Sequence, residues 1–247
     1  MAEFPLAVVT GGAHRLGRAF ALTLAYQGYA VLVHYYRSAH LTNKTIAELK
    51  SFGVPAFSIQ ADLTQAEHVE ALFGLVDSLL SQPDAHLERL AVLVNSAAVM
   101  PRGNAQTLPV EDWDAALDLN LRAPFLCAQQ AFLRMTRGGL IVNISDVGAE
   151  KAWSRFPSYT VSKAAIESLT KVLARSFAPS VRVNAIAPGL VLPSENVSPE
   201  EWEKLIQRLP LKRAATTEEV ASALEFLIKN EYITGQTIVV DGGYSLV

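Results

Sequence analysis

The sequence has a single cysteine, Cys127, among its 247 residues, so no internal disulfide can form. This residue lies in the apolar stretch FLCAQQAF, which is typical of a buried helix face, and we expect it to pack in the core. The net charge of only −3 at pH 7 gives no reason to expect nucleic acid or an anionic membrane as a partner. No apolar run approaches the roughly 20 residues of a membrane span. The first ten residues also lack the basic segment and long apolar run of a signal peptide. We therefore expect a soluble, cytoplasmic protein.

Hydrophobic residues make up half of the chain, which is enough for a substantial core. Short β-branched runs alternate with longer segments of helical periodicity. The strands expected from this pattern are 6–10, 29–36, 56–62, 90–97, 139–145, 181–188 and 234–243. The expected helices are 15–28, 41–53, 66–82, 111–135, 157–178 and 217–230.

Nearly continuous apolar strands are typical of a parallel sheet that is covered on both faces. Strict alternation of strand and helix predicts a doubly wound arrangement, because right-handed crossovers place helices on both faces. The chain contains no linker, repeat or low-complexity segment. The sequence therefore predicts one α/β domain over residues 1–247, a Rossmann-type parallel sheet of about seven strands.

One connection, residues 188–215, is long for such a fold and contains several prolines. Long connections are often lids or binding loops. We expect a lid here, and a short surface helix from Pro199 to Arg208 is an alternative that is compatible with it.

The stretch TGGAHRLG (10–17) joins the first expected strand to the first helix. Glycines at such a junction let the backbone approach a pyrophosphate, and free N–H groups at the helix start bind its charge. The spacing differs from G-x-G-x-x-G, so simple turn chemistry is the alternative. The position after the first strand favours phosphate binding.

The second strand ends in HYYRS (34–38), where a site for NAD usually has Asp or Glu to bind the ribose 2′-hydroxyl. Arg37 and Ser38 stand there instead, and Arg15 lies in the glycine turn. A guanidinium can bind a 2′-phosphate in a bidentate fashion, so we expect NADPH; a solvated Arg37 is the alternative. Asp62 ends the third strand, where it can meet the adenine or cap the next helix.

Tyr159 and Lys163 are four residues apart, so on a helix their side chains share one face. A tyrosine near its ordinary pKa of about 10 is a poor acid at neutral pH, and a nearby ammonium lowers that pKa. This pair opens a helix just after the fifth strand, at the end of the sheet where ligands of such folds bind. The pattern predicts a proton donor that the lysine makes more acidic.

Taken together and in order, these segments resemble the classical short-chain dehydrogenase/reductase family over essentially the whole chain. The matching segments are TGGAHRLG (10–17), ADL (61–63), NSAA (95–98), LDLNLRAPF around Asn120, IVNIS (141–145), YTVSK (159–163), VNAIAPG (183–189) and TGQTIVVDGG (234–243). The resemblance implies that Tyr159 donates the proton, that Lys163 binds ribose and tunes Tyr159, and that Asn120 holds a water in a proton relay. For Asn120 alone, a helix kink or cap is the other reading. The family is usually a homotetramer or dimer.

The resemblance also implies a set of cofactor-binding residues and no metal site. These residues are Thr10, Gly11, Arg15, Leu16, Gly17, Tyr36, Arg37, Ser38, Asp62, Leu63, Asn95, Ser96, Ala97, Tyr159, Lys163, Pro188 and Gly189.

Two departures from the commonest family pattern narrow the expectation. Arg15 occupies the middle glycine of TGxxxGxG, and Asp146 occupies the place of the serine thirteen residues before the tyrosine. Ser145 is one residue too early, and successive strand residues face opposite ways. Both departures are similar to the pteridine reductase branch, including the dihydromonapterin reductase type. A carboxyl group can relay a proton to a ring nitrogen or bind an amino-pyrimidine edge, so Asp146 joins the expected catalytic residues.

The expected substrate-binding residues surround the same end of the cleft. They are Arg15, Met100, Asp146, Trp153, Tyr159 and Leu190. Met100 stands near the place where pteridine reductases carry an aromatic residue that sandwiches the pterin, and a thioether packs there less selectively. Trp153 and Phe156 can supply an aromatic wall, or they pack in the core or an interface. The expected activity is NADPH-dependent reduction of a pteridine. The alternatives are reduction of a 3-oxoacyl thioester or a ketone, and non-catalytic NADP(H) sensing, whose proteins typically lose the tyrosine or lysine.

Overall fold

A single sheet of seven parallel strands runs through the protein in the order β3-β2-β1-β4-β5-β6-β7. The computed structural model of the chain describes residues 3–194 and 197–247. The strands are β1 (Phe4–Thr10), β2 (Ala30–Tyr35), β3 (Ala56–Gln60), β4 (Leu87–Asn95), β5 (Gly139–Ile144), β6 (Val181–Pro188) and β7 (Thr237–Val240). The order reverses direction between β1 and β4, which is the arrangement that opens a ligand crevice beyond the carboxyl ends of these strands.

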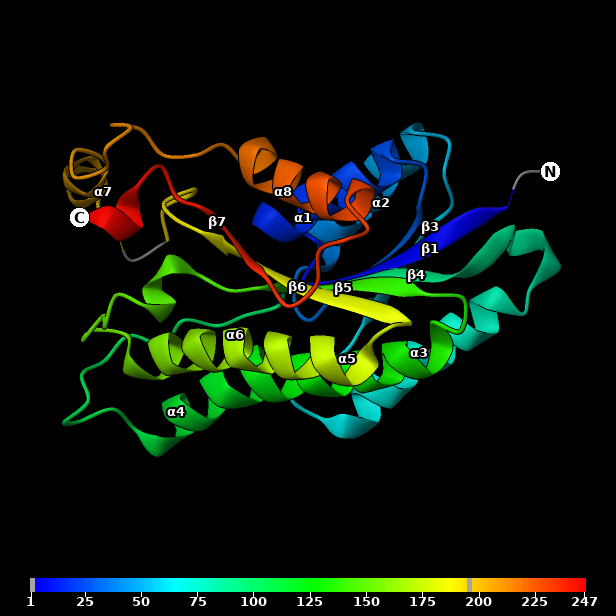
Figure 1. Ribbon diagram of the computed structural model, residues 1–247, viewed down its shortest axis with the longest axis horizontal. Helices are drawn as coiled ribbons and strands as arrows, with labels where there is room; N and C mark the ends of the chain where they lie inside the picture. The colour runs from blue at the N-terminus through cyan, green and yellow to red at the C-terminus, as the bar shows by residue number, and fades with distance from the viewer. Residues whose placement is uncertain (1–2, 195–196) are drawn as a thin grey trace.

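Helices cover both faces of the sheet, as Figure 1 shows: α1, α2 and α8 lie on one side, and α3, α5 and α6 on the other. The helices are α1 (Arg15–Tyr26), α2 (Ala39–Ser51), α3 (Ala66–Leu80), α4 (Val110–Leu117), α5 (Ala123–Arg134), α6 (Pro157–Phe177), α7 (Pro199–Ile206) and α8 (Thr217–Lys229). Short helical turns lie at Pro83–Ala85, Val147–Ala149 and Tyr244–Leu246. The predicted doubly wound fold is confirmed.

The core lies in two layers because the sheet is buried on both sides. In β1, Leu6 and Val8 pack toward the helices of one face, whereas Ala7 and Val9 pack toward those of the other. Alternate strand residues point to opposite faces, so an unbroken apolar run is what this position requires. Burying one such large side chain contributes about 1.5–3 kcal/mol, which holds the sheet rigid beneath the site.

The predicted helix over 111–135 is divided in the structure. A π-helical turn, η2 (Asp118–Arg122), separates α4 from α5, and Asn120 lies within it. Helical periodicity in the sequence does not reveal such a turn, because the apolar spacing continues on both sides. π-Turns inside helices are often found at functional sites.

The last strand is shorter than predicted, since only Thr237–Val240 pair with β6. Before it, the side chain of Asn184 bonds the chain: its Nδ2 donates to Ile233 O at 2.9 Å and its Oδ1 accepts from Gln236 N at 3.0 Å. After it, the Asp241 carboxylate accepts from the backbone N–H of Gly243 and Ser245 and turns the chain away. Side-chain bonds thus fix the chain at both ends of the strand, beside the backbone bonds that join Gly235 and Gln236 to β6.

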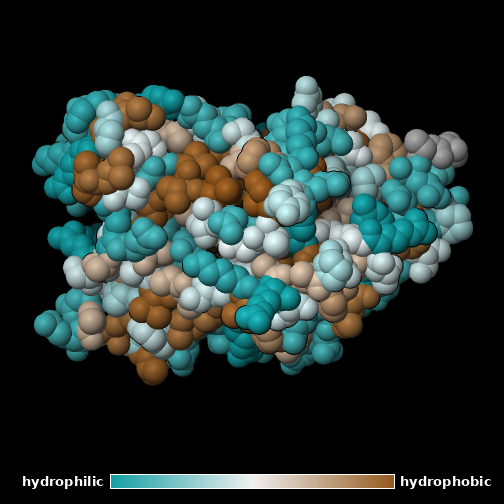
Figure 2. Space-filling model, viewed as in Figure 1, coloured by the Kyte–Doolittle hydropathy of each residue, from teal (hydrophilic) through white to brown (hydrophobic). Residues whose placement is uncertain are grey.

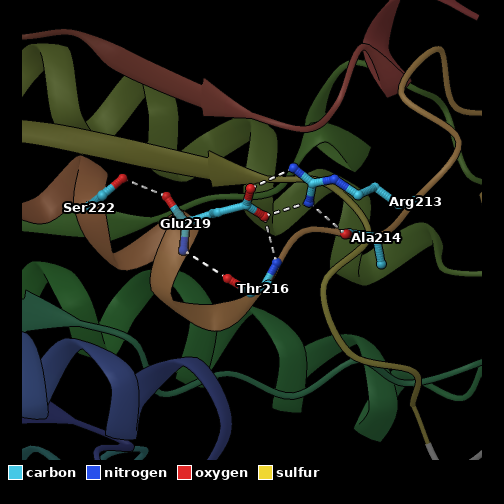
Figure 3. A network of polar contacts seen from close by, with 5 residues as sticks. All are labelled: Arg213, Ala214, Thr216, Glu219 and Ser222. Carbon is cyan, nitrogen blue, oxygen red and sulfur yellow. Dashed lines mark hydrogen bonds and ion pairs between the residues drawn. The ribbon is translucent and has the colours of Figure 1, made fainter.

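The long connection between β6 and α8 contains the short helix α7, as the sequence suggested; residues 195–196 lie outside the described residues. Its far end is fixed by polar contacts that Figure 3 shows: Arg213 donates to both oxygens of Glu219, at 2.7 and 2.6 Å. Thr216 and Glu219 also form a reciprocal capping box at the start of α8. The bonds from Arg213 hold the pKa of Glu219 down at about 2, so this clamp is ionised at any ordinary pH. Within the described ranges, no helix combines the length and apolar character needed to cross a membrane.

Candidate active site

A cleft of about 750 Å³ opens beyond the carboxyl ends of the central strands. Figure 2 shows the surface hollowed at this end of the molecule, between the parts that carry α7 and α4. Of the residues predicted for the site, the cleft is lined by Gly11, Arg15, Leu16, Gly17, Tyr36, Arg37, Ser38, Asp62, Leu63, Ser96, Ala97, Met100, Asp146, Tyr159, Lys163, Pro188 and Gly189. Thr10, Asn95, Asn120, Trp153 and Leu190 are not among its lining residues.

The glycine turn forms one wall of the cleft. Gly11 has φ +63°, a left-handed conformation that glycine adopts freely. A Cβ on Gly17 would lie 2.1 Å from the carbonyl oxygen of Gly11, so only glycine fits. The N-cap of α1, His14, makes no capping bond with its side chain, and the first turn of α1 has no acid. The N–H groups at this helix start can therefore bind an anionic phosphate.

Arg15 stands in the turn at φ +52°, where the common pattern has glycine. A left-handed residue with a side chain costs about 1–2 kcal/mol. Its guanidinium reaches across to the long connection and donates to Leu192 O at 2.9 Å and Pro193 O at 3.1 Å. Arg15 thus joins the glycine turn to the predicted lid, and motion of that lid stays a prediction.

His34 lies beneath the glycine turn and was missed by the sequence analysis. It is 3% exposed, its Nδ1 accepts from Gly11 N at 3.2 Å, and its Nε2 lies 3.0 Å from Ala61 O. These partners require a neutral ring that carries its proton on Nε2. Burial lowers the pKa of His34 to about 4, which keeps the ring neutral. The signal in the sequence was an imidazole at the end of an otherwise apolar strand.

Arg37 and Asp62 lie at the rim of the cleft, at the end that contains the glycine turn. Arg37 is exposed, and its guanidinium stacks 4.8 Å from the centre of the Tyr36 ring, facing the cleft. Asp62 Oδ1 accepts from the N–H and the hydroxyl of Thr64, at 3.1 and 2.8 Å. Asp62 therefore fixes the turn before α3, whose N-cap is Gln65, so the alternative that Asp62 caps this helix is wrong. The contact of Asp62 with the adenine stays a prediction.

Thr10 and Asn95 support the cleft from below. The Thr10 hydroxyl accepts from Ser96 N at 3.0 Å and Ala97 N at 3.1 Å, which ties the end of β1 to the loop after β4. Asn95 is buried, and its Nδ2 donates to Asn143 Oδ1 at 2.9 Å. Both residues thus position the backbone that lines the cleft.

At the end of the cleft opposite the glycine turn, Tyr159 and Asp146 form a direct hydrogen bond. The Tyr159 hydroxyl donates to Asp146 Oδ2 at 2.8 Å, and Gly148 N donates to Asp146 Oδ1 at 2.7 Å. Asp146 lies just after β5, with only Ser145 between them, and Tyr159 lies in the first turn of α6. The structure therefore brings together the phenol and carboxyl groups that the sequence analysis selected.

Burial dominates the electrostatics of this pair. It raises the pKa of Asp146 above its ordinary value, against the lowering effect of the bonds from Gly148 and Tyr159. The pKa of Tyr159 also lies well above its ordinary value, first because of burial and then because of the Asp146 carboxyl. The prediction that Lys163 makes Tyr159 more acidic is thus wrong for this structure. Burial thus shifts Asp146 toward its protonated form, and its hydrogen bond with the Tyr159 hydroxyl lets the two groups exchange a proton.

Lys163 is 4% exposed and donates from Nζ to Ile144 O at 2.6 Å, with its ammonium 5.6 Å from the centre of the Tyr159 ring. Burial lowers its pKa to about 8. The Ser145 hydroxyl bonds further along α6, to Lys163 O at 3.2 Å and to Glu167 Oε1 at 2.8 Å, and Tyr159 pairs with Asp146 instead. This confirms that Ser145 does not occupy the place of the family's serine.

Asn120 holds the loop after β4 with its side chain. Its Nδ2 donates to Val99 O at 2.9 Å and to Ser162 Oγ at 3.0 Å, and its Oδ1 accepts from Val99 N at 2.9 Å. The π-turn brings this amide to the loop, so Asn120 positions the backbone beside Met100. The predicted water relay stays a prediction, and the side chain already has three protein partners.

The expected aromatic wall is displaced from the cleft. Trp153 packs in a separate apolar cluster with Leu190, Val147, Leu209 and Tyr244. A Cβ on Gly148 would lie 2.8 Å from the Trp153 ring, so the indole presses on the turn whose N–H binds Asp146. The Trp153 ring packs in this apolar cluster and thus supports the turn that holds the Asp146 carboxyl. Met100, which is 38% exposed, lines the cleft instead.

The profile of a family described as enoyl-(acyl carrier protein) reductase matches residues 11–245. The chain is 36% identical to 1-cyclohexenylcarbonyl-CoA reductase of Streptomyces collinus, over 98% of this chain and 87% of that protein. It is 35% identical to 3-oxoacyl-(acyl-carrier-protein) reductase FabG of Staphylococcus aureus, over 96% of each. This chain belongs to the short-chain dehydrogenase/reductase family.

Membership of the short-chain dehydrogenase/reductase family makes the protein an NAD(P)-dependent oxidoreductase. Among solved structures, the chain is similar to the FolM alternative dihydrofolate reductase 1 of Brucella suis in complex with NADP. The TM-score is 0.88 at 34% identity, over 99% of this chain and 96% of that one. The family resemblance read from the sequence is confirmed, and the relatives include reductases of several substrate classes.

Proposed function

We propose that this protein is an NADPH-dependent reductase of pteridines of the dihydropterin or dihydrofolate type. The observation that carries the proposal is the bond of 2.8 Å between the Tyr159 hydroxyl and Asp146 Oδ2. It places a carboxyl group where the commonest family pattern has a serine, beside the proton donor. A reaction that delivers a proton to a ring nitrogen uses such a group, whereas carbonyl reduction needs only a hydroxyl.

The proposed cofactor is NADPH, which supplies the hydride when it is bound. Because Gly17 and Gly11 pack closely and have no side chains, a pyrophosphate can approach the start of α1. Arg37, exposed at the rim, is the proposed partner of a 2′-phosphate. Lys163 is the proposed partner of ribose. The structure of FolM from Brucella suis, which is similar over nearly the whole chain, is a complex with NADP and supports this assignment.

The proton path uses the two buried side chains. Tyr159 gives its hydroxyl proton to the substrate nitrogen next to the carbon that receives the hydride. The protonated Asp146 carboxyl then returns a proton to the Tyr159 oxygen along their hydrogen bond. The raised pKa of Asp146 suits this role, because burial favours the protonated form that gives up the proton.

A second candidate is reduction of a 3-oxoacyl thioester or a ketone. The FabG relative at 35% identity favours it, and so does Met100 at the place of the expected stacking aromatic. In that case Asp146 would do the work of the serine with the same proton path.

A substrate panel with NADPH separates the two candidates. We expect oxidation of NADPH, followed by its absorbance, with dihydrobiopterin or dihydrofolate and little with acetoacetyl thioesters, quinones or ketones. Asp146→Ser, which restores the common family residue, should lower pterin reduction by at least about tenfold. Asp146→Asn keeps the shape but carries no acidic proton, so it should be as slow. Turnover of acetoacetyl thioesters alone would establish the second candidate.

A cytoplasmic homotetramer or dimer is proposed for the assembled enzyme, following the family. Light scattering of the purified protein measures the size.

A further inference from the structure

A row of ionisable side chains along α6 continues beyond the active site. Tyr159, Lys163, Glu167 and Lys171 follow one another at intervals of four residues, so they lie along one side of the helix. The first two line the cleft. The last two line a second cavity of about 240 Å³.

This second cavity lies between α6 and the edge of the sheet. Its lining is rich in charged and polar groups and comes from the turn after β5, from α6, from the end of β6, and from β7 and the segments that flank it. The lining residues are Asp146, Val147, Glu150, Glu167, Lys171, Ala187, Gly235, Gln236, Thr237, Val239 and Ser245. Such a lining can hold water, because polar groups supply the hydrogen-bonding partners that a water in a cavity needs.

Asp146 forms the wall between the two cavities. Among the described lining residues, it alone belongs to both. A carboxyl group has about four hydrogen-bonding positions, and the bonds to Tyr159 and Gly148 use two of them. The carboxyl can therefore bond to Tyr159 and to water of the second cavity at the same time.

Glu167 is held beside this wall. The hydroxyl of Ser145, the residue next to Asp146, bonds Glu167 Oε1 at 2.8 Å. The ionisable groups around Asp146 are thus Tyr159 and Lys163 on the cleft side. On the other side they are Glu150, Glu167 and Lys171, together with Tyr244, whose pKa is raised by burial and by the Asp146 carboxyl.

The second side of Asp146 offers the reaction a route to solvent, in addition to the relay predicted at Asn120. Each hydride consumes one proton, and a substrate and cofactor that fill the cleft exclude water from it. We propose that the cavity between α6 and β7 is the route by which solvent protons reach Asp146, with Glu167 as the relay residue at its wall. The inference rests on the proposed reduction but not on its substrate, since a pteridine and a ketone each take one proton per hydride.

The proton balance is simple. Tyr159 loses its proton to the substrate, Asp146 restores it, and the Asp146 carboxylate takes one proton from water of the second cavity. Glu167 takes a proton from solvent, passes it to that water and so ends the turnover in its starting state. Over one turnover the protein is unchanged, and solvent loses one proton for each hydride transferred.

The test separates proton uptake from hydride transfer in a single turnover. NADPH absorbance follows the hydride, and a pH indicator in weak buffer follows the proton, with whichever substrate the panel shows to be reduced. In the parent enzyme we expect uptake to keep pace with hydride transfer, before product leaves. Thr237→Phe, which fills the cavity from β7, and Glu167→Gln should delay uptake by at least about tenfold while hydride transfer stays within about twofold.

Glu70→Gln removes an exposed carboxyl on α3 and is the matched control. In this variant we expect proton uptake to keep pace with hydride transfer. Thermal unfolding and NADPH titration show whether each variant is folded; if Thr237→Phe is not, Glu167→Gln decides. Uptake that stays in step in both folded variants, or that waits for product release in the parent enzyme, overturns the proposed route while leaving the substrate assignment intact. If neither pterins nor carbonyl compounds are reduced, the proposed function is wrong and the proton route has no reaction to serve.

Discussion

The two ends of the cleft are lined by different kinds of chemical group. At the nucleotide end, backbone N–H groups, tightly packed glycines and a neutral imidazole shape the wall, and Arg37 stands exposed at the rim. At the chemical end, Asp146, Tyr159 and Lys163 are ionisable side chains packed against one another in a buried corner.

This difference follows from what each end must do. Binding a phosphate needs fixed dipoles that stay the same throughout the reaction, and backbone groups held by close packing provide them. Moving a proton needs ionisable groups held in direct hydrogen-bonding contact, and the buried pair of Tyr159 and Asp146 provides them. Changes at the chemical end should therefore alter turnover, whereas changes at the nucleotide end should alter affinity for NADPH.

The largest effect is expected from Tyr159→Phe. Removing the hydroxyl takes away the proton donor and leaves the ring, so turnover should fall by about 10²–10⁴-fold. NADPH affinity, measured by fluorescence titration, should change little. Unchanged turnover would show that another group donates the proton.

Gly17→Ala tests the nucleotide end through packing alone. The new methyl would meet the backbone of Gly11 at 2.1 Å, and no side-chain rotation relieves that contact. We expect NADPH affinity to fall by at least about tenfold, with a lower melting temperature. Gly74→Ala is the matched control: it lies in α3 with nothing within 4 Å of its Cβ, and should stabilise the protein by up to about 1 kcal/mol. Equal behaviour of the two variants would contradict the proposed cradle.

His34→Ala tests whether the turn needs its imidazole. The N–H of Gly11 loses a buried partner, which costs about 1–3 kcal/mol, so NADPH should bind about 5- to 100-fold more weakly while turnover at saturation is kept.

The same residue gives a pH dependence of stability. Its folded pKa of about 4 lies below the ordinary 6.5. The folded state is therefore favoured above pH 6.5, and this contribution is lost as the pH falls from 6.5 to 4. As the pH falls through this range, the melting temperature should fall less in His34→Ala than in the parent protein. An equal fall in both proteins would mean that His34 does not contribute to the loss of stability in acid.

The smallest effect is expected from Arg37→Asp. Because Arg37 is exposed, solvent screens its charge, and its exchange should shift the preference from NADPH toward NADH by about fivefold to tenfold. Ratios of kcat/KM for the two cofactors measure the shift. An unchanged ratio would place recognition of the 2′-phosphate on other residues, such as Arg15.

Much of the site was predictable because it depends on local patterns. The glycine turn follows an apolar strand, Tyr159 and Lys163 are one helical turn apart, and Asp146 comes just after a strand, thirteen residues before the tyrosine. These relations are fixed by the 3.6-residue and two-residue periods of helix and strand.

Other features depend on contacts between distant parts of the chain. His34 reads as a core residue until the strand order brings it to Gly11 and Ala61. Trp153 reads as a wall of the substrate site, and it packs on Gly148 because Tyr244, from the end of the chain, completes an apolar cluster there. Spacing cannot reveal such partners, since they lie tens of residues or more apart.

The sequence by itself determined the alternation of strands and helices, the family and the identity of the reacting groups, because these follow from local periodicity and motif spacing. Only the tertiary structure decided how those groups behave. Burial and the Asp146 carboxyl raise the pKa of Tyr159 where a neighbouring lysine alone would lower it. The folding of β7 beside α6 also gives Asp146 a second, polar side. The depth of burial and the partner across a fold are set by how distant segments pack, and that packing fixes the cost of each charge.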